Sequence, residues 1–205
     1  MYVAMKDLEI RGAGNLLGGE QSGHIAGVGF DLYVRMIGEA VTELRGDGPA
    51  EKPEVRVELP INAHIPHDYV AGERLRLEAY TRIAAIDSEA DIATVLDELT
   101  DRYGAPPEPV LNLLEVARLR VIARRAGLTD ITLQGSHVRF APVTDLPDSR
   151  QVRVQRLYPK TILKPAVATM LVPVPKTAVI GGQPLRDMAL LAWSGEVIRS
   201  VLTPS

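Results

Sequence analysis

The stretch SEADIATVLDELTDRYG, residues 88–104, decides the fold of the longer part of this chain. Its apolar residues recur at helical spacing and share one face; they are Ile92, Val95, Leu96, Leu99 and Tyr103. Ser88 is a typical N-cap, and Asp91 three residues later comes close to a capping box. Gly104 follows the last apolar position and ends the pattern. The stretch therefore predicts an amphipathic helix with one buried face.

Two more helices are predicted on either side of this stretch. AGERLRLEAYTRIAAI, residues 71–86, precedes it and ends before Asp87. PPEPVLNLLEVARLRVIARRAG, residues 106–127, follows it, with prolines at its start, a glycine after its end, and two arginines in its last turn, where positive charge suits the helix dipole. Further upstream, VRVELP at residues 55–60 alternates as a half-buried strand that ends at Pro60.

The remaining residues predict further strands and a last helix. DITLQGSHVRF, residues 130–140, indicates two short strands that turn at Gly135. RQVRVQRL (150–157) and AVATMLVPV (166–174) indicate further strands, and PLRDMALLAWSGEVIRSVL (184–202) an amphipathic helix. Residues 55–205 are thus predicted to form a compact α+β domain: a strand, three helices, several strands and a terminal helix.

A different segment precedes this domain. Residues 1–46 contain a glycine-rich run, DLEIRGAGNLLGGEQSGHIAGVG (7–29), and then an amphipathic helix in FDLYVRMIGEAVTELRG (30–46). Residues 47–54 combine Gly, Pro and charges, and predict a linker. No lysine follows any glycine of the run as a phosphate-binding P-loop requires, and the spacing from Gly12 to Gly18 is one residue too long for a dinucleotide fingerprint. The run is therefore not a nucleotide loop, and a loop with so many glycines is typical of a functional segment.

Composition excludes several classes of function. The chain of 205 residues has a net charge of −3 and no cysteine, which excludes disulfides and thiolate chemistry. The histidines, His24, His64, His67 and His137, are scattered, so a metal site is not expected. The acidic balance disfavours a surface devoted to DNA. No apolar run approaches the ~20 residues of a membrane span, and we expect a cytoplasmic protein.

Two stretches resemble known families. DLEIRGAGNLLGGEQSG, residues 7–23, resembles the translocation motif shared by the RecG helicases and the transcription-repair coupling factors. VELPINAHIPHDYVAGERLRLEAYTRIA, followed by LDELTDRYGAPPEPVLNLLEVARLR, is similar to the C-terminal domain of the coupling factors, which RecG lacks. The resemblance covers residues 1 to about 126 and is weak beyond Thr129, where it depends on the order of elements.

The resemblance implies a fragment of a larger motor protein. The coupling factors are ATP-driven translocases on double-stranded DNA that remove stalled RNA polymerase from a lesion and recruit excision repair. Their ATP and magnesium are held by two motor lobes with a P-loop and a DE-x-H box, neither of which occurs in this chain. We therefore expect this fragment to bind no cofactor and to catalyse no reaction of its own.

The same resemblance gives roles to the motif residues. Arg11 and Gln21 match the positions that relay ATP-driven lobe movement to the DNA-contacting loop, and a planar guanidinium suits this role because it binds bidentately. Asp7 and Glu9 are interpreted as structural anchors. Gly12 and Gly14 complete the motif.

A second site is predicted on the helix of residues 89–103. Asp97, Glu98 and Asp101 lie opposite its apolar stripe, and most such faces are simply solvated. In the coupling factors, this domain docks on an amino-terminal UvrB-like module of the same protein and masks the surface that binds UvrA. The resemblance implies that Glu98 and Asp101 meet arginines of that module. Because exposed ion pairs contribute only about 0–1 kcal/mol each, several would form a lock that can still open.

Other functions remain open from the sequence. Arg118, Arg120, Arg124 and Arg125 would fit a DNA-binding helix, but they spread around the helix and Glu115 interrupts them, so solvation and helix-end charge are favoured. A small enzyme with a polar pocket would need a nucleophile–base pair or a metal-spaced cluster, and neither is found. A free-standing DNA-binding adaptor is disfavoured by the net charge.

Overall fold

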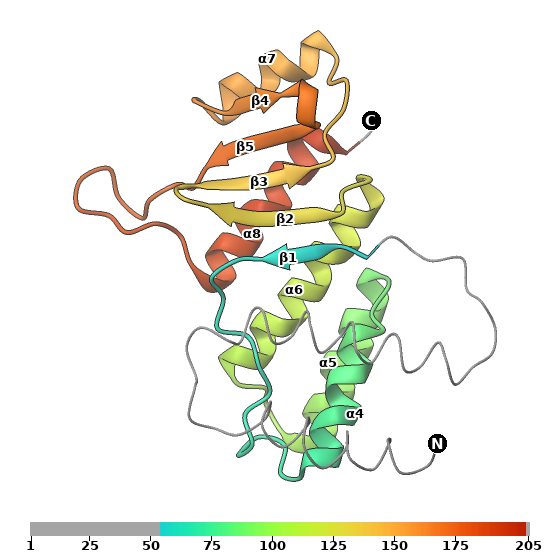
Figure 1. Ribbon diagram of the computed structural model, residues 1–205. Coiled ribbons are helices and arrows are strands. Elements are labelled where there is room, and N and C mark those ends of the chain that lie inside the picture. The colour runs from blue at the N-terminus through green and yellow to red at the C-terminus, as the bar shows by residue number, and fades with distance from the viewer. Residues whose placement is uncertain (1–53, 204–205) are drawn as a thin grey trace, which may run out of the picture.

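Residues 54–203 form a mixed sheet with helices packed against one of its faces, and three helices stand in sequence between its first two strands (Figure 1). We describe these residues in a computed structural model. The α+β architecture predicted for residues 55–205 is confirmed. The glycine-rich run, the helix expected in residues 30–46 and nearly all of the expected linker lie outside the described residues.

The sheet contains five strands in the order β1-β2-β3-β5-β4. β1 (Arg56–Glu58) pairs in parallel with β2 (Asp130–Gln134), and the other neighbours are antiparallel. β3 (His137–Ala141) forms the predicted hairpin with β2 around Gly135, whose φ of 60° favours glycine. β5 (Thr169–Pro173) and β4 (Ile162–Lys164) complete the sheet.

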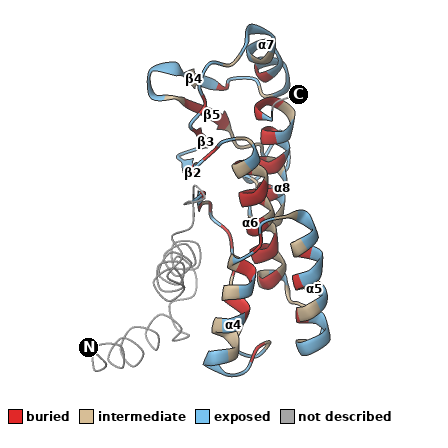
Figure 2. Ribbon diagram, turned by 90° about the vertical axis from the view of Figure 1, so that its right-hand side faces the viewer, coloured by how far each residue is buried: buried red, intermediate tan, exposed pale blue. Residues whose placement is uncertain are grey.

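One face of the sheet forms the core with two helices. The register aligns Val57, Ile131, Phe140 and Met170 across four strands, and all four are buried. α6 (Glu108–Arg125) and α8 (Asp187–Val197) lie over this face, and Figure 2 shows their buried sides turned toward the sheet. The chain then continues from α8 into a single π-helical segment, Ile198–Leu202. The helix predicted in residues 184–202 is therefore confirmed.

Two further helices pack on α6. α4 (Glu73–Ala84) and α5 (Glu89–Tyr103) lie side by side in Figure 1, below the β1 edge of the sheet. Both elements of the predicted capping box are present: Asp91 donates its backbone N–H to the Ser88 side chain, and its carboxylate accepts from the Ser88 backbone. Ile92, Val95 and Leu99 are buried, and Leu96 and Tyr103 are half-buried against the core, which confirms the predicted apolar stripe.

An extended segment joins the sheet to the helices. Only Arg56–Glu58 pairs as a strand, but the alternation of buried residues continues past the predicted end at Pro60 as far as residue 65. The Asn62 backbone carbonyl accepts from the Asn112 side chain at 2.9 Å, and its N–H donates to Asp187 at 2.6 Å. The Ile65 N–H donates to the Tyr80 hydroxyl at 2.8 Å. This segment therefore ties α4, α6 and α8 to the β1 edge.

Residues 150–157 are not a strand as predicted but belong to a helix, α7 (Asp148–Leu157). The alternation of Val152 and Val154 with polar residues suggested a strand. In the helix only Val154 is buried, whereas the Val152 side chain is exposed. Pro147 stands at the N-cap and Asp148 in the first turn, a start that suits a helix.

The last strands differ from their predicted extent. The strand expected in residues 166–174 begins only at Thr169, because Pro165–Val167 form a 3-10 turn and Ala168 has a φ of 45°. The three-residue strand β4 was not predicted. After β5, the loop of residues 174–186 projects from the sheet before α8 begins (Figure 1).

Candidate docking surface

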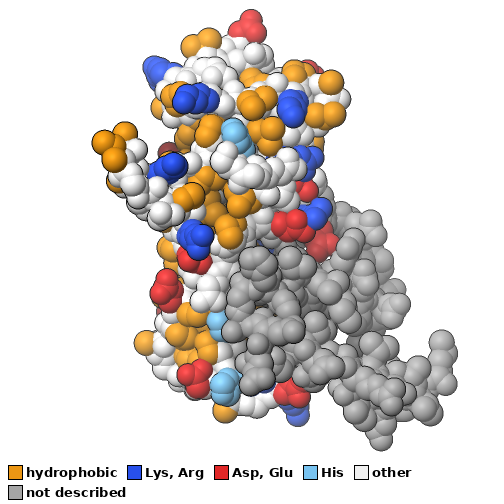
Figure 3. Space-filling view, turned by 60° about the vertical axis from the view of Figure 1, so that its left-hand side comes forward, with side chains coloured by type: hydrophobic (Ala, Val, Ile, Leu, Met, Phe, Trp, Pro, Cys, Tyr) orange, Lys and Arg blue, Asp and Glu red, His pale blue; other side chains and the backbone are white. Residues whose placement is uncertain are grey.

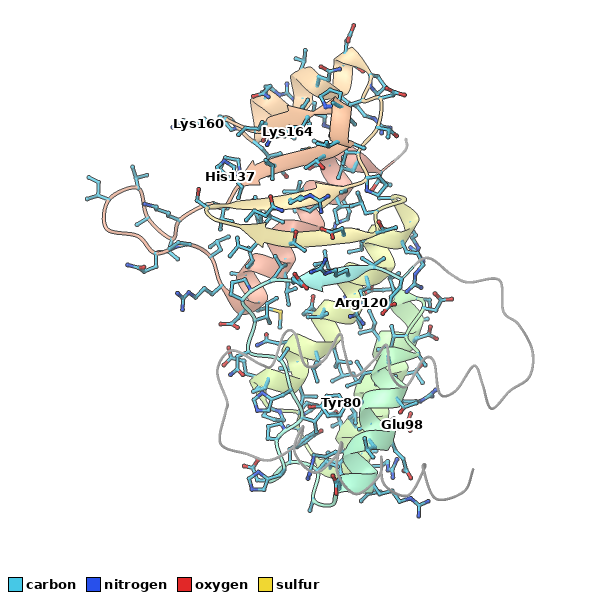
Figure 4. All side chains as sticks on the ribbon, viewed as in Figure 1. Tyr80, Glu98, Arg120, His137, Lys160 and Lys164 are labelled. Atoms are coloured by element: carbon cyan, nitrogen blue, oxygen red, sulfur yellow. The ribbon has the colours of Figure 1, made fainter. Side chains whose placement is uncertain are left out.

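Three carboxylates share the outer face of α5. At 100° per residue, Asp97, Asp101 and Glu98 fall within a 100° arc opposite the buried stripe. Asp97 and Asp101 are exposed, and Glu98 is half-buried toward α4 (Figure 4). The structure thus brings together all three residues predicted for docking, on one accessible surface. We call these three residues the α5 acidic face.

Glu98 already has a cationic partner within the domain. Arg82 on α4 donates from Nε to the Glu98 carboxylate at 3.0 Å, and the two side chains are 53% and 37% exposed. No ion pair joins Asp97 or Asp101 to another residue of the 54–203 range. An external arginine would therefore meet two available carboxylates and compete with Arg82 for the third.

Hydrogen bonds and ring contacts fix the C-terminal end of α5. The Tyr69 hydroxyl donates to the backbone carbonyls of Leu99 and Gly104, at 3.3 and 3.0 Å. Its ring lies edge-on to Tyr103, with centroids 5.9 Å apart, and the Arg102 guanidinium lies 5.2 Å from the Tyr103 ring centre. The burial of the Tyr69 ring raises the pKa of its hydroxyl, which stays a donor. These contacts hold the acidic face in place.

The arginines of α6 attach the other end of α5. Arg118 donates to Glu89 at 2.7 Å and pairs with Glu115, and Arg124 pairs with Asp87. These two arginines, which the sequence interpretation assigned to solvent, instead hold the α4–α5 connection and the first turn of α5 against α6. Their pairing within the domain removes them as phosphate contacts.

Arg120 is the buried member of this group, with 9% of its surface exposed. Desolvation by burial, and secondarily the charge of Arg124, lower the pKa of Arg120 to about 10, so the side chain stays protonated at neutral pH. Sequence periodicity did not identify it as buried, because arginine side chains are mostly exposed in folded proteins. Only Arg125, at the helix end, is exposed as predicted.

The other predicted sites fall elsewhere. The motif residues Asp7, Glu9, Arg11, Gly12, Gly14 and Gln21 lie outside the described residues. Among residues 54–203, no group of three or more His, Asp or Glu could hold a metal ion. No helix within this range has the length and apolar character to cross a membrane. The α5 acidic face is therefore the predicted site for which the structure supplies a geometry.

Comparison with known proteins shows one family throughout. Residues 59–151 match the family model of the TRCF domain. The transcription-repair-coupling factor of Mycobacterium bovis is 51% identical over 213 residues, which cover 98% of this chain and 17% of that protein. The factor of Staphylococcus haemolyticus is 38% identical over 161 residues, covering 78% of this chain and 14% of that protein. The chain thus spans about a sixth of the length of these relatives.

The fold has a match among solved structures. A crystal structure of the C-terminal domain of a transcription-repair coupling factor superposes with a TM-score of 0.55. The superposed region covers 73% of this chain and 94% of that domain, at 16% sequence identity. The likeness of fold therefore includes residues beyond 129, where the sequence resemblance is weak.

Proposed function

Because the chain belongs to the transcription-repair-coupling factor family, we propose that it is the regulatory part of a DNA translocase that removes stalled RNA polymerase and couples transcription to nucleotide-excision repair. In this role its α+β domain docks through the α5 acidic face on the UvrB-like amino-terminal module of the same protein. Docking masks the UvrA-binding surface of that module until the motor engages. The domain itself catalyses no reaction, and ATP and magnesium are bound by the motor lobes.

One observation carries this proposal: three carboxylates share an accessible arc, and only one of them has an ion-pair partner among residues 54–203. The Arg82–Glu98 pair adds a feature that suits a reversible contact. When the docked arginine leaves, Glu98 returns to Arg82, and the charge is not left alone. The free-energy cost of undocking is therefore smaller than the free energy of the intermolecular ion pair. The Arg82–Glu98 pair that re-forms has a similar, small free energy and offsets part of the loss.

The translocation motif adds a second part to the proposed function. The family has Arg and Gln at the positions of Arg11 and Gln21, and we assign to these residues the relay of motor movement. Asp7 and Glu9 are assigned as anchors of the same segment, and Gly12 and Gly14 complete the motif. The support is the motif itself, DLEIRGAGNLLGGEQSG.

A binding titration of this chain against the separate UvrB-like module tests the docking. The variant Glu98→Arg plus Asp101→Arg turns attraction into repulsion at two positions, so we expect affinity to fall by about tenfold or more, and the loss to shrink at high salt. Glu73→Arg plus Glu196→Arg gives the same change in net charge at exposed positions outside α5 and serves as the matched control.

A third variant separates this mechanism from general charge effects. Arg82→Ala frees Glu98, so we expect tighter docking, by up to about fivefold for a pair worth about 0–1 kcal/mol. Equal affinities for the parent chain, the double reversal and the control would exclude the α5 acidic face as the docking site.

A further inference from the structure

Charge is segregated along the described chain. Residues 149–186, which we call the basic segment, contain seven Lys or Arg and no Asp or Glu. Residues 54–148 contain ten basic and sixteen acidic residues. A modest net charge of −3 therefore conceals two regions of opposite sign. The cations of the basic segment are Arg150, Arg153, Arg156, Lys160, Lys164, Lys176 and Arg186.

Most of the other described cations have acidic partners, whereas these seven do not. Elsewhere in residues 54–203, seven arginines form ion pairs: Arg56, Arg74, Arg82, Arg118, Arg124, Arg139 and Arg199. None of the basic-segment cations forms an ion pair with a described residue. All but the half-buried Arg150 are exposed. Their positive field is therefore directed at the surroundings of the molecule.

Apolar side chains are exposed in the same segment. Seven large hydrophobic residues are exposed in the described chain, and six of them lie here: Val152, Leu157, Ile162, Val167, Val179 and Ile180. Figure 3 shows basic and hydrophobic side chains interspersed over the end of the molecule that carries α7 and β4. A contiguous group of this kind marks an interaction site, unlike single exposed hydrophobics.

Most of these side chains gather around α7 and β4. We define the α7–β4 surface by its cations and its aliphatic residues: Arg150, Arg153, Arg156, Lys160, Lys164, Val152, Leu157, Ile162 and Val167. On α7 the two kinds alternate around the exposed side, because Arg156 lies about 40° and Leu157 about 140° from Val152 at 100° per residue. The surface is therefore mixed throughout and has no separate polar and apolar faces.

The backbone beneath this surface is fixed by side-chain hydrogen bonds. Gln155 donates to the Thr161 carbonyl at 3.0 Å, and the Thr161 hydroxyl donates to the Tyr158 carbonyl at 2.6 Å. Gln151 donates to the Leu146 carbonyl at 2.8 Å. Val154 anchors α7 in the core. A surface that is already ordered loses less entropy on binding, which favours association.

From this combination we propose that the α7–β4 surface binds a protein surface that is acidic around an aliphatic centre. Arginines steer and orient such a partner, and the aliphatic side chains supply the buried area. Arginine-rich, partly apolar composition is typical of protein interfaces. This binding does not depend on the docking of α5, because the two surfaces lie at opposite ends of the molecule (Figure 4, Glu98 against Lys160 and Lys164).

Nucleic acid and membrane fit these observations less well. DNA phosphates would form ion pairs with the cations, but they would give the exposed aliphatic side chains no apolar contact. Single strands bind on exposed aromatic rings, and the one aromatic residue of the basic segment, Tyr158, packs against Trp193 with its hydroxyl 2.9 Å from Ser200. A helix that lies in a membrane interface separates its charged and apolar faces, whereas α7 mixes them.

Fluorescence anisotropy with defined probes tests the proposal on the complete chain. The first probe is a short labelled helical peptide with a leucine stripe flanked by glutamates. Companion probes are the same peptide with serine in place of leucine, a DNA duplex of equal charge, and vesicles rich in phosphatidylserine. We expect the Leu/Glu peptide to bind at least about tenfold more tightly than the serine peptide, as aliphatic burial requires.

Variants connect binding to the surface. Two double variants should each weaken binding of the Leu/Glu peptide by about tenfold. One is Arg153→Glu plus Arg156→Glu, and the other is Val152→Ser plus Val167→Ser. A peptide with lysines in place of glutamates should regain affinity for the charge-reversed variant. Arg74→Glu plus Arg125→Glu, exposed on α4 and α6, should leave the affinity unchanged. Thermal denaturation confirms that each variant is folded.

Four results would overturn the proposal. Tighter binding of the duplex would assign the surface to nucleic acid, and tighter binding of the vesicles would assign it to lipid. If neither pair of substitutions changed the affinity for the Leu/Glu peptide, the binding site would lie elsewhere on the chain. Failure of every probe to bind would show that this surface is only a solvated part of the domain.

Discussion

Asp91 closes the first turn of α5 by accepting two backbone hydrogen bonds. Its Oδ2 lies 3.0 Å from the backbone nitrogen of Asp87 and 2.9 Å from that of Ser88. The hydrogen bond from Asp87, followed by that with the Ser88 side chain, lowers the pKa of the carboxyl below its ordinary value of 3.8. Because the folded-state pKa is the lower one, the ionised carboxylate stabilises the domain above the unfolded-state pKa. That stabilisation is lost as pH falls through the folded-state pKa.

Substitution of Asp91 should therefore have an effect that depends on pH. Asp91→Asn keeps an acceptor oxygen but loses the charge, so we expect the variant to unfold at lower urea than the parent chain at pH 7. The two midpoints should converge as pH falls from the ordinary carboxyl pKa of 3.8 through the lower folded-state pKa, where the parent carboxyl gains its proton. Urea titrations at neutral and acidic pH measure this. A constant difference between the midpoints across that range would show that the charge of Asp91 has no part in stability.

Residues that act locally were readable from the sequence, and residues that act across the fold were not. The Ser88–Asp91 cap was predicted because both partners lie within four residues. The pairing of Arg82 with Glu98 was not, because it joins two helices whose relative rotation the sequence does not give. The α5 acidic face was predicted in full, whereas the competing cation beside it appears only in the fold.

At the scale of elements, α7 shows how a period-two pattern can mislead. Val152 and Val154 would lie on the same face of a strand but are about 200° apart on a helix. The helix buries Val154 completely and leaves Val152 at 69% exposure. Two valines are too few to distinguish the two periods, and the helix start at Pro147 and Asp148 was the more informative signal.

The two valines distinguish the helix from a strand experimentally. We expect Val154→Ala to lower the free energy of unfolding by about 1–3 kcal/mol, because it leaves a cavity, and Val152→Ala to change it by no more than about 0.5 kcal/mol. Chemical denaturation of both variants provides the measurement. Equal losses from the two substitutions would indicate that both side chains share one buried face, as in a strand.

Elements with long periodic patterns and clear ends were predicted well. α4, α5, α6 and α8 each have such a pattern, and the β2–β3 hairpin has its glycine turn. β4 has only three residues and no alternation of its own, so it is defined by its pairing with β5 and not by its sequence. The late start of β5 was also not evident from the sequence, because Pro165–Val167 form a turn within a run of apolar residues.

For the whole molecule, the net charge hides an uneven distribution of acidic and basic residues along the chain. The net charge of −3 argued against anionic partners, but it sums an acidic helical end and a basic end around α7 and β4. The sequence contained the information, since residues 149–186 lack acidic side chains. The fold was needed to show that basic and exposed apolar side chains are interspersed at one end of the molecule (Figure 3).

The relay assigned to the translocation motif belongs to this scale, because it couples the fragment to motor lobes outside it. In the full-length protein we expect Arg11→Ala and Gln21→Ala to slow DNA translocation by about fivefold or more, the range of a typical coupling free energy, while ATP hydrolysis persists. Parallel assays of triplex displacement and phosphate release make the comparison. Asp47→Ala, in the predicted linker, is the control. Loss of both activities in proportion would show that the residues act in catalysis or folding and not in coupling.

The extended segment of residues 55–65 also has a mechanical consequence. Any pull exerted on the domain through the residues that precede it arrives first at β1, an edge strand with one neighbour. An edge strand held only by its hydrogen bonds to one neighbouring strand would separate from the sheet under such a load. Here the load is spread over a row of buried aliphatic side chains and the hydrogen bonds of Asn62 and Ile65 before it reaches α4. The segment therefore passes such a load from β1 to several helices at once.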